Sequence, residues 1–137
     1  MLSVFPQILD YGFYAPTILR LALGVIFLAH GWKKLAGDKT QFAGWLESIK
    51  FKPGKFWGWI VTLVEFFGGI SLLFGFLIQP AAMILAIEFL IIIFWARRGQ
   101  PFMLAEGHGR EFDVLILFAL LALLVLGPGA WAIDLPL

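Results

Sequence analysis

Cysteine is absent from the chain, and charged residues are scarce. The absence of cysteine excludes a disulfide framework, a thiol redox pair, and zinc or iron–sulfur centres held by cysteine. Asp, Glu, Lys and Arg make up only 14% of the residues, against roughly a quarter in soluble domains. The formal net charge of +1 gives no electrostatic reason to expect a nucleic-acid partner.

Apolar residues are abundant instead, at 61% of the 137 residues. A soluble domain of this length could not bury so much apolar surface, whereas a lipid bilayer removes that difficulty. The length fits a single domain over residues 1–137. The first 15 residues contain no Lys or Arg, so no cleavable signal peptide is expected. We therefore predict an integral membrane protein.

Four apolar runs, near residues 16–35, 57–78, 80–96 and 112–127, are candidates to span the bilayer. A spanning helix needs about 20 residues, and backbone groups in hydrocarbon must be satisfied within the segment, so these runs should be helices. Gln79-Pro80 is expected to form a tight turn between the second and third helices. The predicted fold is an all-α membrane protein with four transmembrane helices in an up-down bundle.

A short amphipathic helix is predicted near residues 40–50. Phe42, Trp45, Leu46 and Ile49 recur at helical spacing and form an apolar stripe, with polar residues on the other face. Such a helix can lie in the membrane surface or pack over the end of the bundle. The sequence favours neither placement over the other.

The distribution of basic residues predicts the orientation in the membrane. Segments 1–15, 79–80 and 128–137 contain no Lys or Arg. The basic residues of the opposite loops are Lys33, Lys34, Lys39, Lys50, Lys52 and Lys55 in the first and Arg97, Arg98 and Arg110 in the second. The positive-inside rule places both of these loops in the cytoplasm and both termini outside.

Ionisable residues inside the apolar runs are the candidate ligand-binding or polar-core residues. Arg20, Glu65 and Glu88 lie well inside, and His30 lies nearer the basic loops. A charge at mid-membrane costs about 2.5 to 3.5 kcal/mol on insertion scales, so such residues usually face the bundle interior and find partners. Arg20 is the basic residue that reaches mid-membrane most readily, and we predict that it pairs with Glu65, Glu88 or both. A purely structural polar clamp is the alternative.

A second polar cluster is expected at the cytoplasmic mouth, where Glu106, His108, Arg110, Glu111 and Asp113 fall close together. Acidic side chains are favourable at the start of the fourth helix. Two histidines with scattered carboxylates are poor metal-ligand spacing. We therefore predict a solvated loop with helix capping, and no metal site.

Three stretches together resemble the DoxX family of bacterial and archaeal membrane proteins: LRLALGVIFLAHGWKKLAG (19–37), GWIVTLVEFFGGISLLFG (58–75) and GREFDVLILFALLALLVLGPGAWAID (109–134). Arg20, the H-G-x-x-K motif that starts at His30, E-F-F-G-G from Glu65, and Glu111 stand at positions similar to family motifs, whereas Glu88 fits less clearly. The resemblance implies a four-helix protein of the plasma (inner) membrane. It also implies a link to redox chemistry, because some relatives are subunits of thiosulfate:quinone oxidoreductase.

Three functions follow as hypotheses. In the first, the chain is a membrane subunit of a quinone-linked oxidoreductase. Arg20 or His30 would hydrogen-bond a quinone, Glu65 or Glu88 would relay protons, and a partner oxidoreductase would be required. In the second, it is a small-solute or proton carrier, which would need a homo-oligomer. In the third, it is a non-catalytic membrane scaffold or assembly partner. The bilayer is the expected surrounding in all three.

Overall fold

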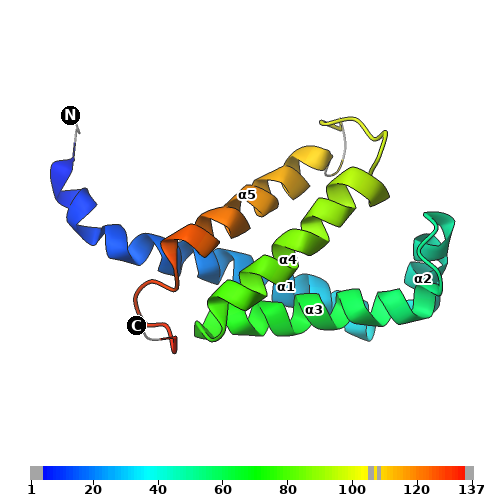
Figure 1. Cartoon of the computed structure of the whole chain (residues 1–137), viewed down its shortest axis with the longest axis horizontal. Helices are drawn as coiled ribbons and strands as arrows, with labels where there is room; N and C mark the ends of the chain where they lie inside the picture. Colours follow the sequence, from blue (N-terminus) through cyan, green and yellow to red (C-terminus); the bar gives the residue numbers. More distant parts are fainter. Residues whose placement is uncertain (1–4, 105–106, 108, 135–137) are drawn as a thin grey trace.

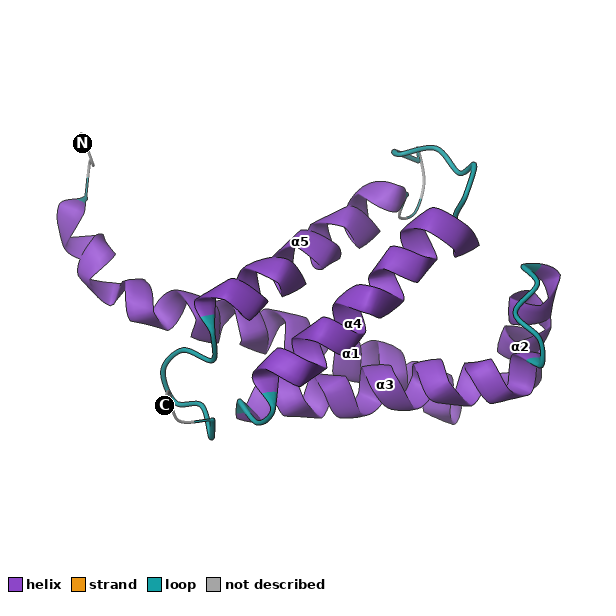
Figure 2. Ribbon diagram, viewed as in Figure 1, coloured by secondary structure: helices purple, strands orange, loops and turns teal. Residues whose placement is uncertain are grey.

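A computed structural model of the chain describes residues 5–104, 107 and 109–134, and over these residues its regular secondary structure is helical. The fold is thus all-α, as predicted. Figure 2 shows the helices and the short loops between them. In chain order they are the 3₁₀ helix η1 (Pro6–Tyr14), α1 (Ala15–Ala36), α2 (Lys39–Ser48), α3 (Gly54–Phe74), α4 (Ile78–Ile91), the π-helical turn η2 (Ile92–Ala96) and α5 (Arg110–Leu126).

The long helices form two antiparallel pairs. Helix α1 packs along α3, α4 packs along α5, and the second pair crosses the first (Figure 1). We call the end with the start of α1, the α3–α4 turn and residues 127–134 the terminal end. The opposite end, with α2, η2 and the start of α5, is the basic end. Figure 1 shows that the two pairs lie close together at the terminal end and diverge toward the basic end.

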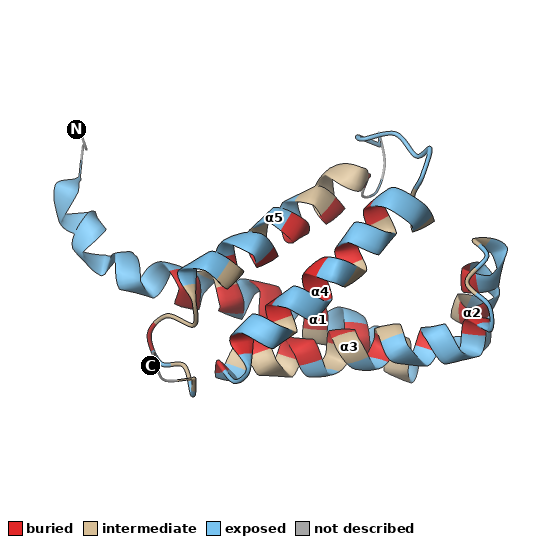
Figure 3. Ribbon diagram, viewed as in Figure 1, coloured by how far each residue is buried: buried red, intermediate tan, exposed pale blue. Residues whose placement is uncertain are grey.

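Glycines let α1 and α3 approach closely. A Cβ atom added to Gly31 would lie 2.6 Å from the Phe66 nitrogen, and one added to Gly69 would lie 2.5 Å from the Leu28 nitrogen. Such contacts leave no room for a side chain, so both glycines lie where the two helices meet. Figure 3 shows buried residues where the helices meet and exposed residues on their outer faces. These outer faces are rich in large apolar side chains, as expected for surfaces in contact with lipid.

Within the part of the chain that the structure describes, three helical stretches are long and apolar enough to cross a membrane: Pro6–Ala36, Gly54–Phe74 and Ile78–Ala96. Helix α5 has 17 residues, at the lower limit of the range of about 17 to 25 for a spanning helix. The structure therefore supports a membrane protein with several spanning helices. Length and composition alone support three of the four predicted spans.

The predicted turn at Gln79-Pro80 is wrong. Both residues lie in the first turn of α4, and the chain reverses just before it, at Gly75 to Leu77. Gly75 ends α3 with φ of +71°, a left-handed conformation that glycine adopts without steric cost. Pro80 is compatible with a helix start because its missing N–H falls among the groups that have no intrahelical partner. With η2 counted as the continuation of α4, no other predicted boundary of a spanning helix is more than four residues from the observed one.

The predicted amphipathic helix is confirmed as α2. The Asp38 carboxylate accepts a hydrogen bond of 2.8 Å from the Thr40 backbone N–H and so caps the start of the helix. Ala43 and Leu46 are buried where α2 packs against α3. The sequence left two placements open for this helix. In the structure it packs over the end of the bundle, against α3.

Candidate functional site

The guanidinium group of Arg20 is buried at the terminal end, and it binds backbone carbonyls rather than carboxylates. Its Nε donates to Pro128 at 3.1 Å, Nη1 to Leu72 at 3.1 Å and Leu73 at 2.7 Å, and Nη2 to Ala130 and Trp131 at 3.1 Å each. A guanidinium group carries five N–H donors. All five are therefore used, and none is left for a ligand.

The predicted pairing of Arg20 with Glu65 or Glu88 is wrong for a physical reason. Leu72 and Leu73 lie in the last turn of α3, whose carbonyls have no intrahelical N–H partner. The negative end of the helix dipole also attracts a cation there. Arg20 therefore finds its acceptors at its own depth in the membrane, in the polar backbone of two chain reversals.

Further contacts close the terminal end around Arg20. The Thr17 hydroxyl donates to the Ala130 carbonyl at 2.8 Å. The Asp134 carboxylate accepts from the Leu77 N–H at 2.9 Å and the Ile78 N–H at 2.7 Å, which caps the start of α4. We call Thr17, Arg20 and residues 128–134 the Arg20 clasp. The clasp ties the C-terminal segment to α1, α3 and α4. The contacts of Arg20 are therefore those of a structural polar clamp, the alternative given in the sequence analysis.

Glu65 pairs with Lys34 near the basic end. The Lys34 Nζ lies 2.7 Å from the Glu65 Oε2, and the Glu65 side chain is almost completely buried. The sequence interpretation gave Lys34 only a role in orientation. A signal for its inward position was present, because Arg20, Gly24, Phe27, Gly31 and Lys34 recur at steps of four and three residues along one face of α1.

Glu88 lies beside this ion pair. Its carboxyl group interacts electrostatically with the Glu65 carboxylate and the Lys34 ammonium group, and both of its oxygens are buried. Among the described residues, Glu65 alone lies within ion-pair distance of Lys34, and Glu88 interacts with both charges at longer range. This cluster, which we call the Lys34–Glu65–Glu88 triad, has more acidic groups than cations.

The triad opens onto a cavity of about 440 Å³, the central cavity, which lies between the diverging helix pairs. Its polar lining consists of His30, Lys34, Glu65, Glu88, Arg97 and Asp113. The rest of the wall is aliphatic and aromatic, and it includes the whole predicted stripe of α2, namely Phe42, Trp45, Leu46 and Ile49. The stripe therefore faces the cavity. Three of the predicted core residues, His30, Glu65 and Glu88, meet here, and Arg20 does not.

Trp95 of η2 contacts the loop after α2 near the basic end. Its indole N–H donates to the Ile49 carbonyl at 2.9 Å, and its ring packs edge-on against Phe51. These contacts join the loop after α2 to the end of the α4 segment. They bridge the two helix pairs at the basic end.

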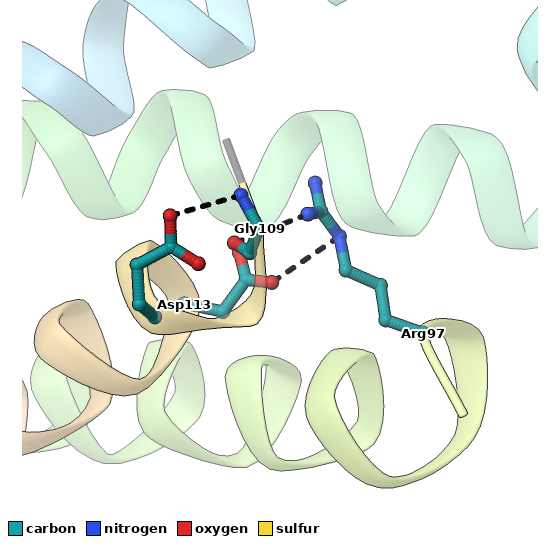
Figure 4. A network of polar contacts seen from close by, with 4 residues as sticks. Arg97, Gly109 and Asp113 are labelled. Atoms are coloured by element: carbon teal, nitrogen blue, oxygen red, sulfur yellow. Dashed lines mark hydrogen bonds and ion pairs between the residues drawn. The ribbon is translucent and has the colours of Figure 1, made fainter. Parts of the chain in front are cut away.

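The predicted cytoplasmic mouth is partly described. The Arg97 Nε lies 3.2 Å from the Asp113 Oδ2, and the Arg97 Nη1 donates to the Gly109 carbonyl at 3.4 Å, as Figure 4 shows. The Glu111 carboxylate accepts from the Gly109 N–H at 3.2 Å, so it takes part in capping the start of α5. Arg97 and Asp113 line the central cavity. Of the other three predicted residues, Arg110 is the first residue of α5, and Glu106 and His108 lie outside the described residues.

These features define a small helical integral membrane protein with an internal cavity and a buried acidic cluster. Comparison with known sequences gives its family. The DoxX family model matches residues 15–98, so the chain belongs to the DoxX family. The matched region contains the whole Lys34–Glu65–Glu88 triad and Arg20, whereas α5 and the C-terminal part of the clasp follow it.

Three relatives match most of the chain. The uncharacterized membrane protein Rv3486 of Mycobacterium tuberculosis is 31% identical over 125 residues, covering 85% of this chain and 77% of that protein. The inner membrane protein YqjF of Escherichia coli is 32% identical over 123 residues, covering 85% and 87%. A Bacillus subtilis protein named "Putative oxidoreductase CatD" is 29% identical over 119 residues, covering 85% and 82%. No solved structure matches the chain.

Proposed function

We propose that this protein is a membrane subunit that binds a quinone in the central cavity and supplies protons to it, together with a partner oxidoreductase that supplies the electrons. The observation that carries the proposal is the position of the acidic triad on the wall of a largely apolar cavity inside the membrane-spanning helices. The apolar wall would bind the quinone ring. The few polar side chains of the wall would hydrogen-bond the quinone oxygens.

The size and lining of the cavity support a flat apolar ligand. Ligand pockets typically enclose about 300 to 1,000 Å³ and are mostly apolar, with a small number of polar groups that fix orientation. The volume of about 440 Å³ falls in this range. The side chains of Phe27, Phe42, Trp45 and Trp57 give the cavity aromatic walls. Aromatic walls suit the stacking of a planar ring.

The triad supports a role in proton transfer. Reduction of a quinone to a quinol takes up two electrons and two protons. One Lys34 charge balances one of the two carboxylates, and in the proposed mechanism the other carboxyl group carries a proton that it can donate. His30, also on the cavity wall, would donate a hydrogen bond to a quinone oxygen. The name of the Bacillus subtilis relative supports a redox role of this kind.

The proposal includes a fourth crossing by α5, with both termini outside and the basic end in the cytoplasm. At 1.5 Å per residue, a helix of 17 residues is about 25 Å long. The Arg20 clasp supports the crossing, because it holds residues 128–134 at the same end as the start of α1. A C-terminus on the side of the N-terminus requires an even number of crossings. The positive-inside rule then gives the orientation, in a bacterial or archaeal plasma membrane.

Quinone binding by the purified chain tests the proposal. Decylubiquinone and menaquinone-4 are titrated into protein in detergent, and binding is followed by tryptophan quenching and by thermal stabilisation. Val64 lines the cavity, whereas Val125 is 87% exposed on the outer face of α5. Val64→Trp should fill the cavity and abolish binding, and Val125→Trp should retain it. Equal binding by both variants, or no binding by the unaltered protein, contradicts the proposal.

A flux experiment separates the proposal from the carrier alternative. The protein is placed in liposomes without quinone, and proton flux is measured with a pH-sensitive dye. The proposed subunit should show no flux above that of empty liposomes. Flux that is abolished by Glu65→Gln would favour the carrier instead.

A further inference from the structure

A second, smaller pocket of about 90 Å³ lies on the outside of the basic end. We call it the lysine pocket. Its lining residues come from the end of α1, the start of α2 and the first half of α3, and they are Lys34, Lys39, Thr40, Phe42, Lys55, Gly58, Trp59 and Thr62. Its walls thus combine three ammonium groups with two aromatic rings. Neither the proposed function nor the family assignment gives this pocket a role.

The balance of charge around the pocket favours an anion. Lys34 is engaged by Glu65, so it adds little net charge. Lys39 lies over the Trp59 ring, with its Nζ 4.2 Å from the ring centroid, and the exposed Lys55 also lines the pocket. The Asp38 carboxylate, next to Lys39 in the chain, accepts from the Thr40 N–H and hydroxyl at 2.8 and 2.5 Å. Two lysines without a carboxylate among the pocket's lining residues thus remain available to an anion.

An apolar surface leads away from the pocket along α3. Trp59, Leu63 and Phe67 lie four residues apart on one face of the helix, and all three are exposed. The stripe begins at the pocket and runs toward the middle of the spanning helix. Exposed apolar side chains on a spanning helix contact acyl chains, and tryptophan is enriched where a membrane meets water.

We infer that the lysine pocket binds the phosphate group of an anionic phospholipid, with one acyl chain lying along Trp59, Leu63 and Phe67. Basic pockets beside spanning helices attract anionic head groups. The inference does not depend on quinone binding. It has a structural consequence, because Lys34 and Phe42 line both the lysine pocket and the central cavity. A lipid bound outside would therefore contact residues that also form the wall of the cavity.

Lipid binding by the full chain tests the inference. Delipidated protein in detergent is titrated with phosphatidylglycerol or phosphatidylcholine, and bound lipid is counted by native mass spectrometry. The doubly substituted variant Lys39→Gln/Lys55→Gln removes charge from the pocket. The control Lys50→Gln/Lys52→Gln removes the same charge from the loop between α2 and α3, outside the pocket lining. We expect phosphatidylglycerol to bind in preference to phosphatidylcholine, with affinity lowered about tenfold or more in the pocket variant and less than twofold in the control.

Two results would overturn the inference. Equal losses in the two variants would show that the attraction is a diffuse effect of basic charge rather than a property of the pocket. Inorganic phosphate that competes with phosphatidylglycerol at equal concentration would show that a soluble phosphate, not a lipid, is the ligand. A third variant, Leu63→Ser, tests the acyl-chain stripe against Leu115→Ser on the exposed face of α5. Only the former should weaken lipid binding, and equal effects would remove the stripe from the site.

Discussion

The two ends of the bundle differ in how completely their buried charged groups are paired. At the terminal end one cation, Arg20, has every donor matched to a carbonyl oxygen, and the surrounding chain is closed around it. At the basic end, Lys34 pairs with Glu65 beside a cavity, and the buried Glu88 carboxyl group lies near this pair without an ion-pair partner of its own. A charge in a membrane helix therefore does not by itself indicate a ligand site. The imbalance of partners at the basic end is the informative feature.

Replacement of Arg20 should have the largest effect on stability. Arg20→Met removes all five hydrogen bonds of the Arg20 side chain and leaves buried carbonyls without donors, so we expect a loss on the order of 3 to 5 kcal/mol. Thermal unfolding in detergent measures it. Lys33→Met, an exposed change on the same helix, is the control and should alter stability by less than about 0.5 kcal/mol. Similar melting of the two variants would contradict a structural role for Arg20.

At the basic end, Lys34→Met should destabilise the protein by about 2 kcal/mol, because two acidic groups then lack their cation. The loss of stability is smaller than for a fully buried ion pair because the Lys34 side chain is 23% exposed. Glu65→Gln in the same chain should recover most of the loss. A double-mutant cycle with chemical denaturation measures the coupling. Additive losses would mean that Lys34 and Glu65 do not act as a pair.

A smaller loss is expected from Asp134→Asn at the terminal end. The Asp134 carboxylate caps α4 through two backbone N–H groups, and loss of a helix cap typically costs about 1 kcal/mol. The exposed substitution Asp10→Asn provides a control of the same chemistry. Hydrogen exchange of the first turn of α4 should rise in the former variant alone. Unchanged exchange there would show that Asp134 does not cap the helix.

The smallest effect concerns Asp38, the corresponding cap at the basic end. Hydrogen bonds from the Thr40 hydroxyl and backbone N–H lower the pKa of Asp38 below its ordinary value of 3.8. A depressed folded-state pKa means that the capping contribution is present above pH 3.8 and is lost as the pH falls through the lower folded value. Titration of the α2 amide signals by NMR should show this loss, and Thr40→Val should move the midpoint upward. A midpoint unaffected by Thr40→Val would contradict the stated cause.

Much of the fold could be predicted because helix periodicity acts locally. The spacing of Gly24, Phe27 and Gly31 from Arg20 identified the inward face of α1, and the stripe of α2 was visible in the same way. The turn before α4 was missed because a Gln-Pro pair is a stronger local turn signal than Gly75. The deciding interaction there comes from Asp134, which is remote in the sequence.

The site was only half predictable. His30, Glu65 and Glu88 were identified from their depth, because an ionisable residue in a spanning helix is expensive wherever it lies. The partners were not identified, since a sequence does not reveal which carbonyls remain unpaired at a helix end. The central cavity exists because two helix pairs diverge, and that angle depends on side-chain packing along their whole length.

The Arg20 clasp also sets an order for biogenesis. Ala130, which accepts one of the hydrogen bonds of Arg20, is synthesised 110 residues after it. At about 5 to 20 residues per second, that delay is roughly 5 to 20 s. During this time the Arg20 guanidinium group lacks those carbonyl acceptors that belong to residues not yet synthesised. Residues made long after the first helix therefore complete its hydrogen bonding, and a chain that stops short of Ala130 leaves an incompletely bonded arginine in the membrane.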